Sequence, residues 1–124
     1  MDAYSNSKLF NVLFSVGLDN LFKEKNIRNV KTASLHPGVV ETNLASDSSW
    51  VHCMRCICCC MFVKREKGAR TNLHLCRIPF EEIRSGEYYD SDTEHKEMNK
   101  KARDMSAVRK LWEISEKAYG IKFD

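Results

Sequence analysis

The chain has few of the residues that bend or break a backbone, with five glycines and two prolines among 124 residues. The glycines are widely spaced, and no group of them forms the short loop that wraps a phosphate. The sequence therefore lacks the glycine-rich turn by which many nucleotide-binding proteins hold a pyrophosphate. The five positions are Gly17, Gly38, Gly68, Gly86 and Gly120.

Signals for export and for a membrane-spanning helix are also missing. The chain begins Met1-Asp2-Ala3 and continues with polar residues, which is unlike a secretory leader. Its most apolar stretch, residues 50–63, contains Arg55 and is shorter than the about 20 apolar residues that a spanning helix needs. We therefore expect an intracellular protein.

The six cysteines do not have the spacing of a disulfide framework. Five of them crowd into residues 53–60, and neighbouring cysteines are poor partners for one another. This distribution fits a reducing compartment.

Composition and charge indicate one ordinary domain. Apolar residues make up 43% of the chain and charged residues 30%, so we expect a single domain over residues 1–124. The 20 basic and 17 acidic residues are well mixed, which gives no support for nucleic-acid binding.

One basic cluster consists of Lys64, Arg65, Lys67 and Arg70. A solvated helix face is its simpler interpretation, and a surface for phosphate or lipid headgroups is the alternative.

The apolar pattern predicts alternating helices and strands. Residues 3–26 have the periodicity of one long helix, whose wide apolar surface suggests burial against two neighbours. Residues 30–35 are rich in strand-forming side chains and are followed by a proline–glycine pair. The patterns further along predict a helix over 65–76, a short strand over 87–89 and a last helix that stops at Gly120. We expect a helix-rich α/β fold that is incomplete, because two strands cannot form a self-sufficient sheet.

Tyr4 and Lys8 are a candidate acid–base pair. They are four residues apart at the start of the first predicted helix, so both side chains lie on the same face. A tyrosine that works as a general acid near neutral pH needs a pKa about 3 below its free value of about 10. A nearby ammonium and the positive end of a helix dipole both favour the phenolate. On its own, however, this spacing arises frequently by chance.

The pair belongs to a longer series of motifs in a fixed order. Tyr4-Ser5-Asn6-Ser7-Lys8 opens a long helix, a strand follows, and His36-Pro37-Gly38-Val39-Val40-Glu41-Thr42 comes next. This order resembles the short-chain dehydrogenase/reductase family, in which Tyr-x-x-x-Lys precedes a buried helix, a strand and Pro-Gly-Val-x-Thr. One additional residue separates Val39 from Thr42 here. Residues 67–71, 86–89 and 111–113 extend the resemblance over nearly the whole chain, and it is strongest for the retinol dehydrogenase branch.

This resemblance implies the C-terminal portion of a Rossmann-type doubly wound sheet and an NAD(P)-dependent interconversion of an alcohol and a carbonyl. Tyr4 would exchange a proton with the substrate oxygen, and Lys8 would bind the nicotinamide ribose. Pro37 and Gly38 would turn the backbone past the nicotinamide, Val40 would offer main-chain hydrogen bonds to the carboxamide, and Thr42 would add a hydroxyl. The implied cofactor is NADP or NAD, and the implied substrate is lipophilic, like a retinol or a steroid. The implied location is the cytoplasm or the surface of the endoplasmic-reticulum membrane.

The sequence departs from the family pattern in what precedes Tyr4. The family's glycine-rich fingerprint, catalytic serine and ribose-selecting residue all lie upstream of that tyrosine, and no counterpart is found here. We therefore expect about half of a family domain, with little or no turnover on its own. The alternative is a non-catalytic remnant or interaction module, with a homodimer through the helix 3–26 as one form of association.

The cysteine-rich stretch Cys53–Cys60 admits three interpretations. Zinc sites usually combine two cysteine clusters, or one cluster with spaced histidines, and His52 and His74 give no such pattern, so we expect no metal site. S-acylation beside apolar side chains would make a membrane-associated module. The interpretation that fits the resembling enzymes is an apolar cap over a lipophilic substrate, in which free thiols behave as small hydrophobes.

Overall fold

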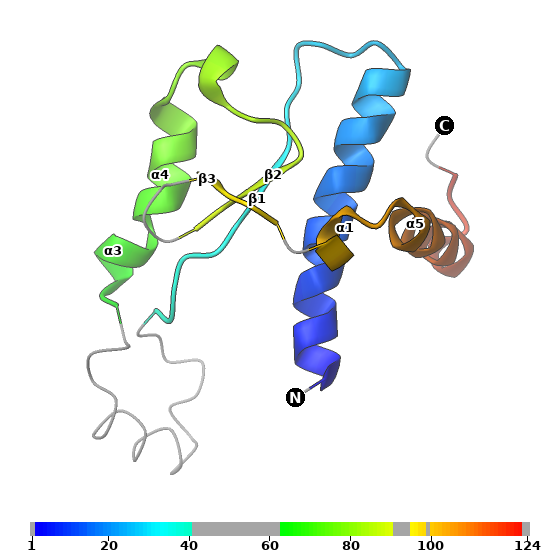
Figure 1. The fold of residues 1–124 in the computed structure, drawn as a ribbon, viewed down its shortest axis with the longest axis horizontal. Helices are drawn as coiled ribbons and strands as arrows, with labels where there is room; N and C mark the ends of the chain where they lie inside the picture. Colours follow the sequence, from blue (N-terminus) through cyan, green and yellow to red (C-terminus); the bar gives the residue numbers. More distant parts are fainter. Residues whose placement is uncertain (1, 41–62, 91–94, 99, 123–124) are drawn as a thin grey trace. The chain divides into compact units, whose positions relative to one another are not determined.

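The computed structural model describes residues 2–40, 63–90, 95–98 and 100–122 (Figure 1). These residues belong to two compact units. The first unit draws on residues 1–34, 79–88 and 95–124, and the second on residues 35–78 and 89–94. The elements include both helices and strands, so the class is mixed α/β. The assignment of residues 1–124 to one family domain stays a prediction.

The longest element is α1 (Asp2–Glu24), which confirms the first predicted helix but ends before residue 26. Asn26 has a φ of 55°, in the left-handed region, and so leaves the helical conformation. The Ile27 N–H donates to the Phe22 carbonyl at 2.8 Å, and the Asn26 N–H donates to the Lys23 carbonyl at 3.1 Å. These two bonds form the Schellman arrangement, which satisfies carbonyls that the end of a helix would otherwise leave unpaired.

Helix α1 is buried on two sides, but not along the whole of its wide apolar surface, because Phe10 is 48% exposed and Phe14 is 39% exposed. Leu13 is 2% exposed, and the polar residues Ser15 and Asp19 are buried as well. The Ser15 and Thr32 hydroxyl oxygens are 2.9 Å apart, and the Asp19 carboxylate pairs with the Lys23 ammonium at 2.5 Å. One of the two buried sides is therefore polar, and hydrogen bonds compensate for the loss of water there.

Three short strands form one sheet of order β1-β2-β3: β1 (Ala33–Leu35), β2 (Glu87–Tyr89) and β3 (His95–Lys96). The Gly86 N–H donates to the Thr32 carbonyl at 2.7 Å, and the His36 N–H donates to the Tyr89 carbonyl at 2.9 Å. Residue numbers rise together along the two strands, so β1 and β2 are parallel and their connection must cross over. The predicted strand over 30–35 shortens to β1, and β2 is confirmed. Strand β3 was not predicted, because its polar sequence lacks an apolar alternation.

The crossover connection contains α3 (Arg65–Gly68), α4 (Arg70–Arg77) and the 3-10 turn η3 (Phe80–Glu82). The helix predicted over 65–76 is confirmed as these two consecutive helices. Ala69 between them keeps helical dihedral angles, φ −77° and ψ −12°. Thr71 on α4 is fully buried, and its hydroxyl donates to the Asp90 carbonyl at 3.1 Å.

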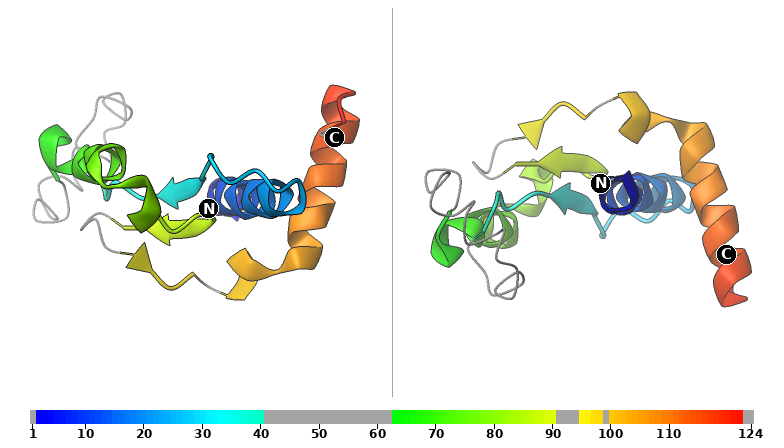
Figure 2. Two further views of the ribbon diagram at one scale, coloured as in Figure 1. Left: turned by 90° about the horizontal axis from the view of Figure 1, so that it is seen from above. Right: turned by 90° about the horizontal axis from the view of Figure 1, so that it is seen from below.

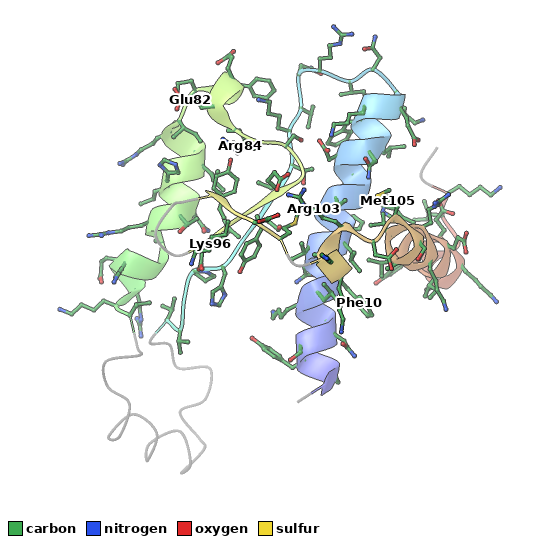
Figure 3. All side chains as sticks on the ribbon, in the orientation of Figure 1. Phe10, Glu82, Arg84, Lys96, Arg103 and Met105 are labelled. Carbon is green, nitrogen blue, oxygen red and sulfur yellow. The ribbon has the colours of Figure 1, made fainter. Side chains whose placement is uncertain are left out.

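The chain continues through the 3-10 turn η4 (Lys100–Arg103) into α5 (Met105–Tyr119). The Asp104 carboxylate caps the start of α5 by accepting from the Ser106 N–H at 2.9 Å. Gly120 has a φ of 65° and ends the helix, which confirms the predicted stop. Arg103, labelled in Figure 3, donates two hydrogen bonds to the Glu87 carboxylate, at 3.0 and 3.2 Å.

Helix α5 crosses α1 within the first unit (Figure 2). The Trp112 ring stacks on Phe14 with 5.0 Å between ring centroids and 12° between planes. Val108 is 3% exposed, whereas Tyr119 is 78% exposed. Helix α5 is therefore packed at Val108 and Trp112, whereas its last turn lies in solvent.

Candidate active site

Helix α1 brings Tyr4 and Lys8 together at its first turns. The Lys8 ammonium lies over the Tyr4 ring, 5.2 Å from the ring centroid, in the geometry of a cation–π pair. Tyr4 is 70% exposed, and Lys8 is exposed as well. The Ser7 hydroxyl donates to the Tyr4 carbonyl at 2.7 Å, which satisfies one polar group of this turn. A phenol and an ammonium are thus adjacent and accessible on one helix face.

This end of α1 offers several hydrogen-bond donors to a ligand rich in oxygen. The first turn of a helix leaves backbone N–H groups without intrahelical partners and carries a partial positive charge. The ammonium contributes three more donors, and the phenol contributes one donor and acceptor capacity. This donor set fits the hydroxyl groups of a ribose.

Pro37, Gly38 and Val40 lie in the second unit, where the chain leaves β1. Gly38 has a φ of 81°, in the region that favours glycine. The Val63 N–H donates to the Val39 carbonyl at 2.9 Å, and Val40 forms a parallel bridge with Val63. The predicted turn after the strand is therefore present. Its C-terminal residues, Val39 and Val40, are paired with Val63.

The structure groups the predicted site residues as follows. Tyr4 and Lys8 are neighbours on α1 in the first unit, and Pro37, Gly38 and Val40 follow one another in the second. Thr42 lies outside the described residues. The catalytic and cofactor-binding roles of all six residues stay predictions.

The described glycines occur singly along the chain. Gly38 has a positive φ, which glycine adopts without strain. Three other glycines are committed to internal packing, since a β-carbon on Gly17, Gly68 or Gly86 would meet the side chains of Trp112, Val40 or Asp19, respectively. Gly120 ends a helix. The glycines of the described residues are thus scattered rather than gathered for a pyrophosphate.

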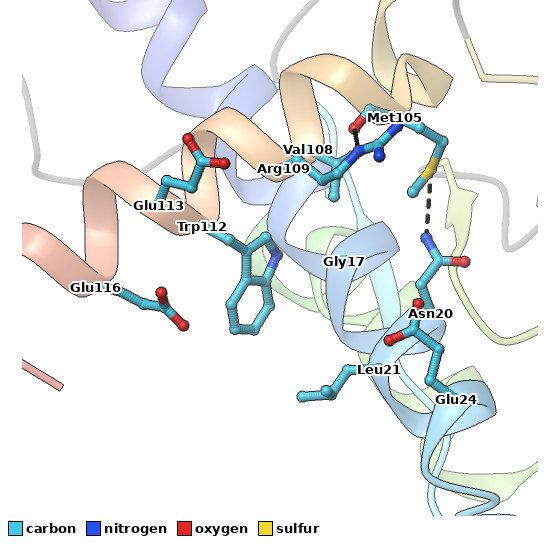
Figure 4. Close-up of a pocket in the computed structure, with 10 residues that line it drawn as sticks. All are labelled: Gly17, Asn20, Leu21, Glu24, Met105, Val108, Arg109, Trp112, Glu113 and Glu116. Carbon is cyan, nitrogen blue, oxygen red and sulfur yellow. Dashed lines mark hydrogen bonds between the residues drawn. The ribbon is translucent and has the colours of Figure 1, made fainter. Parts of the chain in front are cut away.

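A pocket of about 330 Å³ between α1 and α5 was not predicted from the sequence (Figure 4). Leu21, Val108 and Trp112 give it an apolar lining. Glu24, Glu113 and Glu116 also line it, together with polar residues of both helices. Tyr4 and Lys8 are not among its lining residues, so it is separate from the candidate active site. Apolar spacing along each helix was visible in the sequence, but the pairing of two helices so far apart in the chain was not.

Two further features concern membranes and metals. Among the residues that the structure describes, no helix combines the length and the apolar character needed to cross a bilayer. The same described ranges hold no group of three or more histidine, cysteine or acidic side chains that could bind a metal ion. The cysteine-rich stretch Cys53–Cys60 lies outside the described residues, so its three interpretations stay predictions.

Comparison with curated proteins identifies relatives along nearly the whole chain. Human retinol dehydrogenase 14 is 35% identical over 125 residues, a match that covers 95% of this chain and 35% of the relative. Human retinol dehydrogenase 12 is 35% identical over 123 residues, covering 98% of this chain and 37% of the relative. A short-chain dehydrogenase/reductase of Gibberella zeae is 34% identical over 121 residues, covering 93% and 34%, respectively.

The chain is therefore a relative of the short-chain dehydrogenase/reductases, a family of oxidoreductases that use NAD or NADP. Several of the matching relatives are retinol dehydrogenases, 30–36% identical over nearly the whole chain. The chain spans about a third of the length of the curated relatives it matches, which is less than the half expected from its motifs. No family model matches the chain, and no solved structure matches it.

Proposed function

We propose that this chain supplies the tyrosine–lysine helix and the nicotinamide-facing turn of an NAD(P)-dependent oxidoreductase, within the C-terminal portion of a Rossmann-type sheet. Its substrate would be a lipophilic alcohol or carbonyl compound of the retinol or steroid kind. The observation that carries the proposal is the Lys8 ammonium 5.2 Å from the Tyr4 ring, at the exposed start of α1 in a relative of retinol dehydrogenases. The parallel pairing of β1 and β2 across α3 and α4 supports the proposed sheet.

In this proposal each residue has a limited chemical task. Tyr4 donates a proton to the carbonyl oxygen during reduction and recovers it during oxidation. Lys8 binds the ribose hydroxyls and places positive charge beside the phenol. Gly38 permits close approach of the nicotinamide, and Val40 offers its main chain to the carboxamide. When bound, the nicotinamide supplies or accepts the hydride.

The decisive experiment transplants this chain into a relative. The matching segment of human retinol dehydrogenase 14 is replaced by this chain, and the chimaera is assayed for oxidation of retinol with NAD and with NADP. We expect measurable turnover, and we expect Tyr4→Phe to reduce it by about 10²–10⁴-fold, the usual contribution of a general acid. Lys8→Met should lower turnover and raise the KM for the cofactor.

Tyr119→Phe is the matched control, because Tyr119 is 78% exposed at the far end of α5. It should leave turnover unchanged. A folded chimaera whose turnover survives Tyr4→Phe as well as Tyr119→Phe would disprove the role given to Tyr4. Since Tyr4 and Lys8 are both exposed, their loss should not unfold the protein, which circular dichroism would check.

A second candidate function is self-association through α1, and the exposed aromatic residues of this helix favour it. Phe10 is 48% exposed and Phe14 is 39% exposed, and they are four residues apart, on one face of the helix. Large exposed apolar side chains are typical of interaction surfaces when they lie together. Analytical ultracentrifugation of the chain and of Phe10→Ser should give a dimer for the first and a monomer for the second. Equal masses for the two proteins would exclude this surface as the interface.

A further inference from the structure

The helices α3 and α4 carry their charged and their buried residues on different faces. Residues 64–77 include five lysines and arginines and one acidic residue, Glu66. Ala69 keeps helical angles between the two helices, and the Leu73 N–H donates to the Ala69 carbonyl at 3.0 Å, so helical spacing applies across the junction. The basic residues are Lys64, Arg65, Lys67, Arg70 and Arg77.

One side of this helical stretch faces the interior of the second unit. Gly68 and Thr71 are buried, and Leu75 is half-buried, at spacings of three and four residues. A β-carbon on Gly68 would meet the Val40 side chain, so this side is closely packed. The orientation of the helices within the unit is therefore fixed by packing.

The other side forms a basic ridge, defined here as Lys67, Arg70, His74 and Arg77. Spacings of three, four and three residues place these four side chains along one helix face. Lys67, Arg70 and Arg77 are exposed, and His74 is half-buried. Leu73 is 48% exposed between Arg70 and Arg77, one turn from each. An exposed leucine flanked by two guanidinium groups combines an apolar anchor with charge.

We propose that the basic ridge and Leu73 dock on an anionic phospholipid surface. Clusters of four to eight basic residues on an amphipathic helix attract anionic headgroups, and an apolar side chain on the same face can enter the headgroup boundary. The stretch 64–77, with its five lysines and arginines, has the charge for the first interaction, and Leu73 has the exposure for the second. A soluble anion would engage the charges alone and would leave Leu73 without a role. The proposal does not depend on the oxidoreductase function.

The test is sedimentation of the purified chain with vesicles of phosphatidylcholine, with and without added phosphatidylserine. We expect binding only with phosphatidylserine, and weaker binding at high salt. Arg70→Gln with Arg77→Gln should reduce the partition coefficient by about 30-fold, the loss expected from two cationic side chains at such a surface. The matched control, Arg109→Gln with Lys110→Gln, removes the same charge from exposed positions of α5 and should change it by less than about 3-fold.

A second pair of variants tests the apolar anchor. Leu73→Ser should weaken binding, and Ile114→Ser should not, although Ile114 is 57% exposed on α5. Amide hydrogen exchange of the unaltered chain provides a measurement that needs no variant, because vesicles should protect residues 64–77 and not residues 105–119. Soluble glycerophosphoserine should give no such protection. Equal losses in the two double variants, protection elsewhere, or protection by the soluble headgroup would each overturn the proposal.

Discussion

The indole nitrogen of Trp112 occupies the space in which residue 17 would carry a β-carbon. Gly17 is buried in the middle of α1, where glycine is otherwise unfavourable, and Trp112 reaches it from α5. The absence of a side chain at position 17 thus allows the two helices to approach closely. The sequence of α1 is adapted to one particular residue nearly a hundred positions away.

Gly17→Ala should therefore destabilise the protein, although alanine is the better helix former. Alanine gains up to about 1 kcal/mol of helix propensity, but overpacking of a filled interface typically costs about 1–3 kcal/mol. We expect a net loss of about 1–2 kcal/mol, measured by urea denaturation with circular dichroism. Asn11→Ala at an exposed position of α1 is the control and should change stability by less than about 0.5 kcal/mol. Trp112→Leu should cost less in the Gly17→Ala background than alone; additive costs would contradict the close approach.

Gly86 and Gly120 form a natural pair for separating backbone strain from steric overlap. Both have positive φ, 77° and 65°, so alanine at either position costs about 1–2 kcal/mol. A β-carbon on Gly86 would also lie 2.8 Å from the Asp19 carboxylate, whereas one on Gly120 would meet nothing within 4 Å. Gly86→Ala should accordingly cost at least about 1 kcal/mol more than Gly120→Ala in chemical denaturation. Equal costs would mean that Asp19 moves aside freely.

Lys31 is expected to be a structural lysine despite its charge. Its half-buried side chain donates to the carbonyls of Phe80, Glu81 and Ile83, at 2.5, 3.3 and 2.8 Å, and lies 4.5 Å from the Phe80 ring centroid. Lys31→Met keeps the aliphatic stem and removes these bonds, so we expect a loss of about 1.5–3 kcal/mol, the range for hydrogen bonds to a charged group. Lys25→Met, at an exposed position just after α1, should leave the unfolding midpoint almost unchanged. A similar small effect at both positions would argue against a structural role for these Lys31 hydrogen bonds.

The start of α5 should become less stable in acid. Hydrogen bonds from the Ser106 side chain, and then from the backbone N–H groups of Ser106 and Ala107, lower the pKa of Asp104 from its ordinary value of 3.8. A lowered folded-state pKa means that this stabilisation is complete above the unfolded value and is lost as pH falls through the folded value. Asp104→Asn keeps an acceptor for the cap and removes the titration. The difference in unfolding free energy between the two proteins should therefore shrink as pH falls below about 4. Chemical denaturation at a series of pH values would measure it. A difference independent of pH would contradict the cap.

Local features were predictable from the sequence, whereas contacts between distant segments were not. The length of α1 and the stop at Gly120 follow from spacing and from residue type, and one helical turn fixes the neighbourhood of Tyr4 and Lys8. The apolar spacing predicts that α1 ends at residue 26, whereas the helix ends at Glu24. Most asparagines do not adopt the left-handed conformation of Asn26, so residue type alone does not predict this end. Strand β3 exists by pairing with β2, and the pocket between α1 and α5 exists by the approach of Trp112 to Gly17. Neither leaves a periodic signal in the sequence.

The position of Trp112 also gives the molecule an intrinsic fluorescent reporter. The indole is stacked on Phe14 and pressed against the backbone of Gly17, so its emission depends on the docking of one helix on the other. The chain has one other tryptophan, Trp50, and replacing it with phenylalanine would leave Trp112 as the single emitter. A shift of that emission to longer wavelength would then report the separation of α5 from α1, even if both segments remain helical.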